Sequence, residues 1–119
     1  MTWNIQYTKT ADNDLHNIYS HIAYELLEPG VAEKQTNRIM DTADSLDRMP
    51  LRHRPCDYEP WRSKGWRSVP VDNYIIFYFP DESENTVSIL RIMYGGRDLE
   101  ARLSEESPKI SNFVRGVIS

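Results

Sequence analysis

The sequence predicts one α+β domain with the element order β-α-α-β-β-β, in which a mainly antiparallel sheet carries a helical hairpin on one face. Two observations predict this arrangement. The first half of the chain holds two stretches with apolar residues at helical spacing, and the second half holds three apolar stretches of strand length joined by short turns. The length of 119 residues suits a single domain with one hydrophobic core.

The first half begins with a strand and continues into two helices. "TWNIQYT" at 2–8 alternates apolar and polar residues, as a half-buried strand does. The stretch 10–27 carries an apolar residue every three or four positions, with Thr10 expected as its N-cap and "EPG" at 28–30 expected to end it. A second apolar stripe spans 32–50, and the short link between the stripes predicts an antiparallel hairpin.

Three strands are expected after a proline-rich loop at 50–65. "WRSVPV" at 66–71 and "YIIFYF" at 74–79 flank an Asp-Asn turn, and "VSILRIMY" at 87–94 follows a polar turn. Because the turns are short, the three strands should be antiparallel neighbours. The residues expected between the helices and the sheet are Ile18, Ile22, Ile39, Leu46, Ile76, Tyr78, Ile89 and Met93.

The chain divides into a domain at 1–103 and a C-terminal tail at 104–119. The tail follows the last predicted strand and the segment "GGRDLEARL", and its sequence is "SEESPKISNFVRGVIS". Its apolar residues have the spacing of a short amphipathic helix. They are Phe113, Val114, Val117 and Ile118.

Composition points to the cytoplasm. Cys56 is the only cysteine, so an internal disulfide cannot form, and a reducing compartment is expected. No apolar run approaches the ~20 residues that a membrane span needs, and the first ten residues lack the pattern of a signal peptide. We therefore expect a soluble, cytoplasmic protein with no membrane partner.

Positive charge gathers in one segment of an acidic chain. The formal net charge is −4, yet residues 51–68 hold five basic and two acidic side chains. A protein that bound nucleic acid mainly through phosphates would be basic overall, so this segment suits an acidic partner protein equally well. Its aromatic residues can stack on bases or bury against a partner helix, and we favour the partner. The binding residues expected on this ground are Trp61, Arg62 and Trp66.

Three stretches in this order carry a resemblance to a known family. They are "IQYTKTADNDLHNIYSHIA", the hairpin "GWRSVPVDNYIIFYF" and the ending "VSILRIMYGGRDLEARL". Together they resemble the RelE/ParE superfamily of bacterial type II toxins over residues 3–103, closer to the ParE-like branch. The resemblance implies a plasmid-stabilising or growth-inhibiting toxin that a cognate antitoxin neutralises. RelE-like members cut mRNA on the ribosome, and ParE-like members inhibit DNA gyrase.

The resemblance to RelE-like nucleases implies basic catalytic residues at a strand start and at the end of the last strand. Arg67 and Arg97 occupy these places, and Tyr94 stands where some relatives have a histidine. RNA cleavage also needs a proton acceptor and a proton donor. This chain has Ile75 where such nucleases carry an arginine, and Leu103 where they carry a tyrosine. The nuclease set is therefore incomplete, and we leave open whether the protein is an enzyme.

Other polar residues suggest structural or binding roles. Arg91 lies within an apolar strand, where it should pair with an acidic residue or contact the antitoxin. His16 and His21 are five positions apart, on different faces of a helix, so they cannot hold one metal ion. His53 lies in the proline-rich loop, where it is either a base or exposed to solvent. We expect no metal and no cofactor.

The favoured function is that of a ParE-like toxin that binds a protein target such as DNA gyrase. The first alternative is a RelE-like ribosome-dependent endoribonuclease that uses Arg67, Arg97 and Tyr94. The second alternative is a binding module of the same fold that is no longer toxic.

Overall fold

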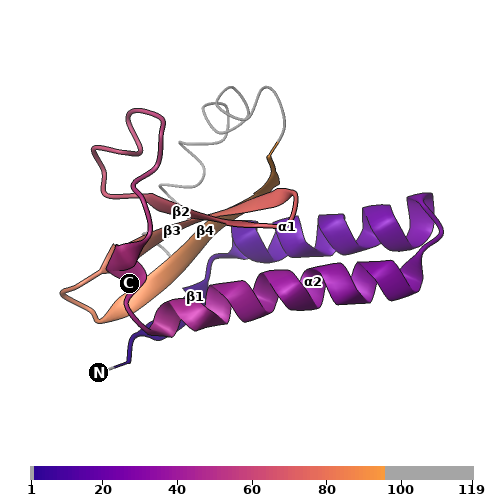
Figure 1. Cartoon of the computed structure of the whole chain (residues 1–119), viewed down its shortest axis with the longest axis horizontal. Helices are drawn as coiled ribbons and strands as arrows, with labels where there is room; N and C mark the ends of the chain where they lie inside the picture. The colour runs from indigo at the N-terminus through magenta and orange to yellow at the C-terminus, as the bar shows by residue number, and fades with distance from the viewer. Residues whose placement is uncertain (1, 96–119) are drawn as a thin grey trace.

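The computed structural model describes residues 2–95 and confirms the predicted α+β fold (Figure 1). The predicted tail and the boundary at residue 103 lie outside the described residues. The described part of the chain contains no helix that is long and apolar enough to cross a membrane. Its main elements are β1 (Asn4–Tyr7), α1 (Lys9–Ser20), α2 (Pro29–Asp44), β2 (Arg67–Val71), β3 (Tyr74–Asp81) and β4 (Thr86–Tyr94).

The four strands form one mixed sheet in the order β1-β4-β3-β2. The pairs β2–β3 and β3–β4 are antiparallel, as the short turns predict. The first strand instead pairs with the last in parallel, with Asn4 opposite Thr86 and Tyr7 opposite Ile89. The strand β4 therefore lies inside the sheet, between β3 and the N-terminal strand β1.

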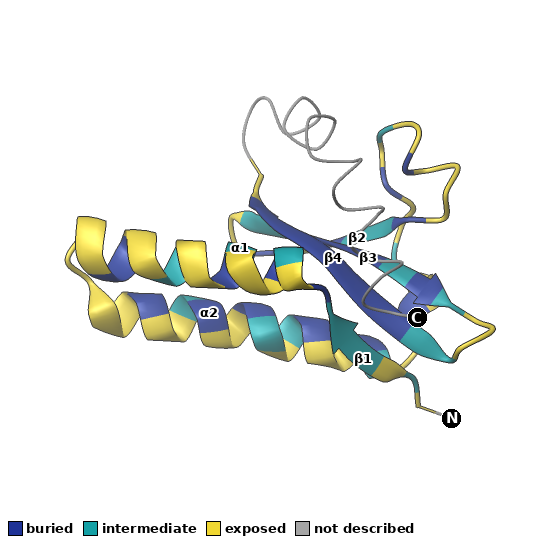
Figure 2. Cartoon of the chain, turned by 180° about the vertical axis from the view of Figure 1, so that it is seen from behind, coloured by how far each residue is buried: buried dark blue, intermediate teal, exposed yellow. Residues whose placement is uncertain are grey.

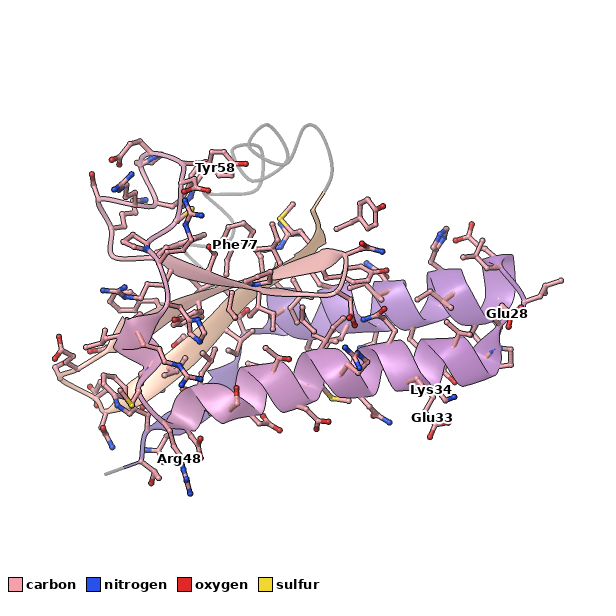
Figure 3. All side chains as sticks on the ribbon, viewed as in Figure 1. Glu28, Glu33, Lys34, Arg48, Tyr58 and Phe77 are labelled. Atoms are coloured by element: carbon pink, nitrogen blue, oxygen red, sulfur yellow. The ribbon has the colours of Figure 1, made fainter. Side chains whose placement is uncertain are left out.

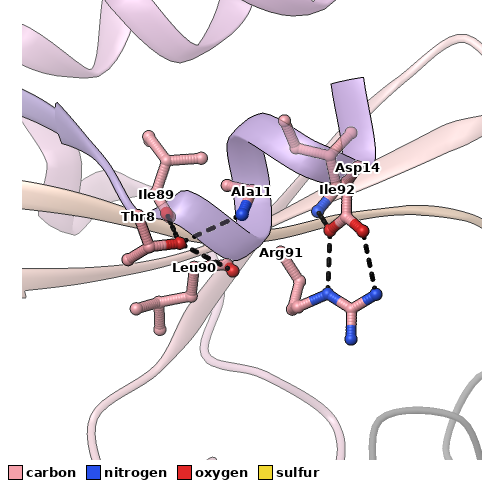
Figure 4. Close-up of polar contacts among 7 residues, drawn as sticks. All are labelled: Thr8, Ala11, Asp14, Ile89, Leu90, Arg91 and Ile92. Atoms are coloured by element: carbon pink, nitrogen blue, oxygen red, sulfur yellow. Dashed lines mark hydrogen bonds and ion pairs between the residues drawn. The ribbon is translucent and has the colours of Figure 1, made fainter. Parts of the chain in front are cut away.

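The buried side chain of Thr8 begins helix α1, rather than the predicted Thr10, which lies inside the helix. The Thr8 hydroxyl accepts a hydrogen bond from the backbone N–H of Ala11 at 3.1 Å. It also lies 3.0 Å from the carbonyl oxygen of Ile89, to which it donates. The Thr8 side chain thus accepts a hydrogen bond from an N–H that has no partner within the helix, and it also links the start of α1 to β4 (Figure 4).

Two apolar clusters cover the two faces of the sheet. The helices pack on one face, and the loop between α2 and β2 packs on the other (Figures 1 and 2). Five of the residues predicted between helices and sheet are buried there, and Ile18 is partly buried against them. The five are Ile39, Leu46, Ile76, Tyr78 and Ile89.

The prediction for Met93 was wrong, because Met93 packs in the cluster under the loop. The pairing of β3 with β4 is irregular between Phe77 and Tyr78, where the partner residue changes from Arg91 to Ile89. This bulge inserts Leu90 and shifts the alternation, so that Ile92 instead of Met93 faces the helices. Ile22 also differs from its prediction, because it packs between the helices with Ala23 and Ala32.

The free end of the helical hairpin projects beyond the sheet (Figure 1). Helix α1 passes into a π-helical turn over His21–Glu25, and Pro29 occupies the first turn of α2. Proline is favoured there because the N–H it lacks would have no partner within the helix. We call the connecting segment from Tyr24 to Val31 the hairpin tip.

Candidate protein-interaction site

A groove lies between the helical hairpin and the ends of β3 and β4. It encloses about 750 Å³. One wall comes from the hairpin, and the opposite wall carries Tyr74 and Tyr94 from the strands. The apolar residues of the first wall are Ile18, Ile22, Leu26 and Val31. Polar side chains, among them Asn17, His21 and Gln35, line the groove beside these apolar ones, and a groove of this mixed character suits a segment of a partner protein.

An ion pair between Asp14 and Arg91 lines the groove (Figure 4). The Nε and Nη2 atoms of Arg91 donate to the two oxygens of Asp14 at 2.8 and 2.9 Å. The backbone N–H of Ile92 donates to Asp14 at 2.9 Å. Arg91 is 4% exposed, so the pair is largely withdrawn from water. The predicted acidic partner of Arg91 is therefore found, on helix α1.

Tyr94 closes the strand side of the groove. Its ring meets Tyr74 edge to face, with ring centroids 5.7 Å apart, and it is 53% exposed. Burial and the neighbouring Tyr94 raise the pKa of Tyr74. The next residue, Gly95, donates its N–H to Asn73, and a Cβ atom there would lie 3.2 Å from the side chain of Ile75. Glycine therefore lets the chain leave β4 close to the β2–β3 turn.

The loop between α2 and β2 is built around two buried tryptophans. Trp61 is 1% exposed and Trp66 is 6% exposed, and their ring centroids lie 6.1 Å apart over the second face of the sheet. Figure 3 shows this loop above Phe77, and Tyr58 of the loop is partly buried against the same cluster. Burial raises the pKa of the Cys56 thiol, which packs in the same cluster.

The exposed cations of the loop point away from this cluster. Arg62 and Lys64 are exposed, while the tryptophans beside them are buried. Any contact of this loop with a partner would therefore use the charged residues, with Trp61 and Trp66 fixing the loop from below.

Arg67 lies at the start of β2 and braces the loop. Its guanidinium donates to the carbonyl oxygen of His53. Burial, together with the charges of Arg52 and Arg67, lowers the pKa of His53. The His53 ring packs edge to face on Tyr78. Burial raises the pKa of Tyr78 to about 12. The lowered pKa of His53 favours a neutral ring next to the charged guanidinium of Arg67.

The structure separates Arg67 from Tyr94 within the sheet. Arg67 pairs with Tyr78, whereas Tyr94 pairs with Tyr74 four residues away on the same strand. This corresponds to roughly 13 Å along the strand direction. Arg97 lies outside the described residues. Among residues 2–95, no group of three or more His, Cys, Asp or Glu side chains could hold a metal ion.

The sequence reading missed Asp14 and the apolar hairpin tip. Asp14 lies near the start of the predicted helix at 10–27, where a carboxylate needs no other explanation. Leu26 belongs to the apolar repeat of that stretch, yet it is 55% exposed. The available signal was Leu26-Leu27 directly before Glu-Pro-Gly, because two leucines at a helix end face either a core or a partner.

Comparison with known proteins gives one family match. Residues 5–99 match the family model for the ParE toxin of the parDE type II toxin-antitoxin system. No curated protein matches the sequence.

Three solved structures share the fold. The toxin-antitoxin complex RelBE2 from Mycobacterium tuberculosis is 26% identical, with a TM-score of 0.57 over 79% of this chain and 92% of that chain. The chromosomal ParDE system from P. aeruginosa is 21% identical, with a TM-score of 0.67 over 80% and 98%. An E. coli RelE mutant in the free state is 9% identical, with a TM-score of 0.62 over 92% and 97%. The last two concern the fold alone.

Proposed function

Because the chain belongs to the ParE toxin family of type II toxin-antitoxin systems, we propose that it inhibits growth by binding a protein target, with DNA gyrase as the first candidate. A cognate antitoxin neutralises it. The family match across residues 5–99 carries this proposal. The similar structure of the toxin-antitoxin complex RelBE2 supports an antitoxin partner.

The geometry of the polar residues favours binding over RNA cleavage. A nuclease needs a base, an acid and cations around one phosphate. The described candidates do not converge, since Arg67 contacts His53, whereas Tyr94 packs edge to face on Tyr74, four residues along β3 from the residue that pairs with Arg67. Arginine cannot act as the base, because it stays protonated at any relevant pH. Tyr94 and His53 therefore serve separate local structures.

The exposed cations of the loop are the proposed contact for an acidic antitoxin segment. Arg62 and Lys64 stand on a loop that Trp61 and Trp66 hold rigidly against the sheet. A loop that is already rigid loses little conformational entropy on binding. Opposite charge on the partner would steer the encounter and speed association.

A gyrase supercoiling assay, run beside a ribosome assay with mRNA in the decoding site, tests the proposed target. We expect the purified protein to inhibit supercoiling and to leave the mRNA intact, and we expect added antitoxin to restore supercoiling. Codon-dependent cuts with supercoiling unaffected would establish the RelE-like alternative instead. No effect in either assay, and no growth arrest on induction, would identify a non-toxic binding module.

A further inference from the structure

The hairpin tip gathers most of the exposed apolar surface of the described chain. Within residues 2–95, seven large apolar side chains are exposed, and four of them lie between positions 24 and 31. They are Tyr24 at 70%, Leu26 at 55%, Leu27 at 78% and Val31 at 50%. Single exposed apolar residues are ordinary, but a contiguous group on a monomer marks an interaction surface.

The backbone of the tip holds Leu27 in a conformation that leucine rarely adopts. Its φ angle is +57°, in the left-handed region. Side chains other than Gly, Asn and Asp enter this region at a cost of roughly 1–2 kcal/mol. Folding alone would favour asparagine or glycine at such a turn. A leucine that is also the most exposed of the group therefore does not serve the stability of the hairpin.

The tip is continuous with the groove. Leu26 and Val31 line the groove as well as the tip, and Tyr94 faces them from the end of β4. A partner segment seated on the tip can therefore place one apolar side chain in the groove. This arrangement of a protruding anchor beside a preformed pocket is typical of binding hot spots.

The surface around the tip is acidic. Glu28, Glu33 and Lys34 are exposed there (Figure 3), and so is Glu25, whose carboxylate lies 2.7 Å from Nδ1 of His21. The basic loop that carries Arg62 lies on the other face of the sheet. The basic loop and the acidic hairpin tip are therefore two separate surfaces of opposite charge. Of the two, the tip is the one with exposed apolar side chains at its centre.

We propose that the hairpin tip is the surface through which the chain engages its target, and that the target offers an apolar site flanked by Lys or Arg side chains. This inference rests on the proposed function and assigns a surface to it. Leu27 is the central anchor, and the glutamates around it favour a basic partner surface.

Replacing Leu27 with asparagine separates binding from folding. Asparagine tolerates the left-handed backbone, so the thermal midpoint should stay the same or rise. Inhibition of gyrase supercoiling should weaken on the order of tenfold, as for a truncated hot-spot residue. Met49→Asn is the matched control, because Met49 is 68% exposed with a φ of +51° and lies in the segment that follows α2, away from the tip. It should inhibit gyrase as the wild type does.

Charge reversal tests the stated chemistry of the partner. Glu28→Lys with Glu33→Lys should weaken inhibition, and the wild-type effect should fall as salt rises. Glu82→Lys with Glu84→Lys makes the same charge change in the exposed β3–β4 turn and should have no effect. If the two double variants weaken inhibition equally, the net charge of the protein and not the position of the glutamates affects inhibition. The glutamates around the tip would then no longer be part of the proposed surface.

The outcomes separate this inference from the proposed target. If Leu27→Asn inhibits gyrase as strongly as the wild type, the tip is not the target surface. If the wild type leaves gyrase active, the gyrase proposal fails, and growth arrest on induction becomes the measurement. Relief of arrest by Leu27→Asn but not by Met49→Asn then supports the tip with another target. Unchanged arrest, or a wild type that arrests nothing, overturns the inference.

Discussion

The ion pair between Asp14 and Arg91 is the most consequential contact of a single residue in this fold. Asp14 satisfies a nearly buried guanidinium and the backbone N–H of Ile92 together. Truncating Asp14 removes this carboxylate from a buried arginine charge. The free-energy cost of that loss exceeds the net stabilisation that the intact pair provides. We expect Asp14→Ala to lower the free energy of unfolding by about 3–5 kcal/mol, as measured by denaturant titration.

Two further variants test this reasoning. Asp14→Asn should cost less than Asp14→Ala, because its one amide oxygen can still accept from Arg91 Nε and the backbone N–H of Ile92, although the bond from Arg91 Nη2 is lost. Asp14→Ala with Arg91→Met should recover much of the loss, since the buried charge is gone. A double variant as unstable as Asp14→Ala alone would mean that the ion pair is not the source of the effect.

The sequence revealed the need for this pair, but could not identify the partner. An arginine inside an apolar strand requires an acidic neighbour, and that requirement is local. Asp14 lies 77 residues away along the chain, so their contact depends on how α1 meets β4. No periodicity within either element carries that information.

At the scale of the elements, the apolar stripes predicted both helices and the three hairpin-linked strands. Strict alternation failed at one position, because the bulge at Leu90 depends on the pairing of β3 with β4. The N-cap was misplaced for a similar reason, since Thr8 is fixed by its hydrogen bond to Ile89 of a distant strand. Local patterns give the type of an element, whereas tertiary contacts decide its ends and its register.

Leu46 tests the packing of helices on the sheet. It is 1% exposed and belongs to the cluster under α1 and α2. Leu46→Ala should lower the free energy of unfolding by roughly 2–5 kcal/mol through lost burial and a residual cavity. Leu51→Ala is the matched control, because Leu51 is 43% exposed and should change stability by no more than about 0.5 kcal/mol. Equal denaturant midpoints for the two variants would contradict the assigned core.

At the scale of the whole molecule, charge is divided between the basic loop and the acidic hairpin tip. The composition of 51–68 predicted the first surface, because local charge can be counted from sequence. It could not predict that Trp61 and Trp66 are buried, since an aromatic residue suits a core or an interface equally. The tip was missed because exposure at a helix end depends on how far the hairpin projects past the sheet.

The basic loop gives a prediction for antitoxin binding. Arg62→Glu with Lys64→Glu should weaken antitoxin binding and reduce its dependence on salt, because both side chains are exposed and neither braces the loop. Arg67 is left intact, since its contact with His53 supports the loop. Titration of antitoxin at two salt concentrations measures the effect. Lys9→Glu with Arg48→Glu is the control, because both side chains are exposed and lie outside residues 51–68 of the basic loop, and an equal loss there would reject the loop as the specific surface.

The parallel pairing of β1 with β4 also has a consequence for the order in which the domain is completed during translation. The first strand is synthesised at the outset, yet its neighbour in the sheet is the last strand described, and Thr8 lies 82 residues from Leu90. At about 5–20 residues per second, several seconds separate the emergence of the two segments. Contacts of such high sequence separation also slow folding. A nascent chain therefore cannot finish its sheet until β4 has left the ribosome, so the binding surfaces built on that sheet are completed only near the end of synthesis.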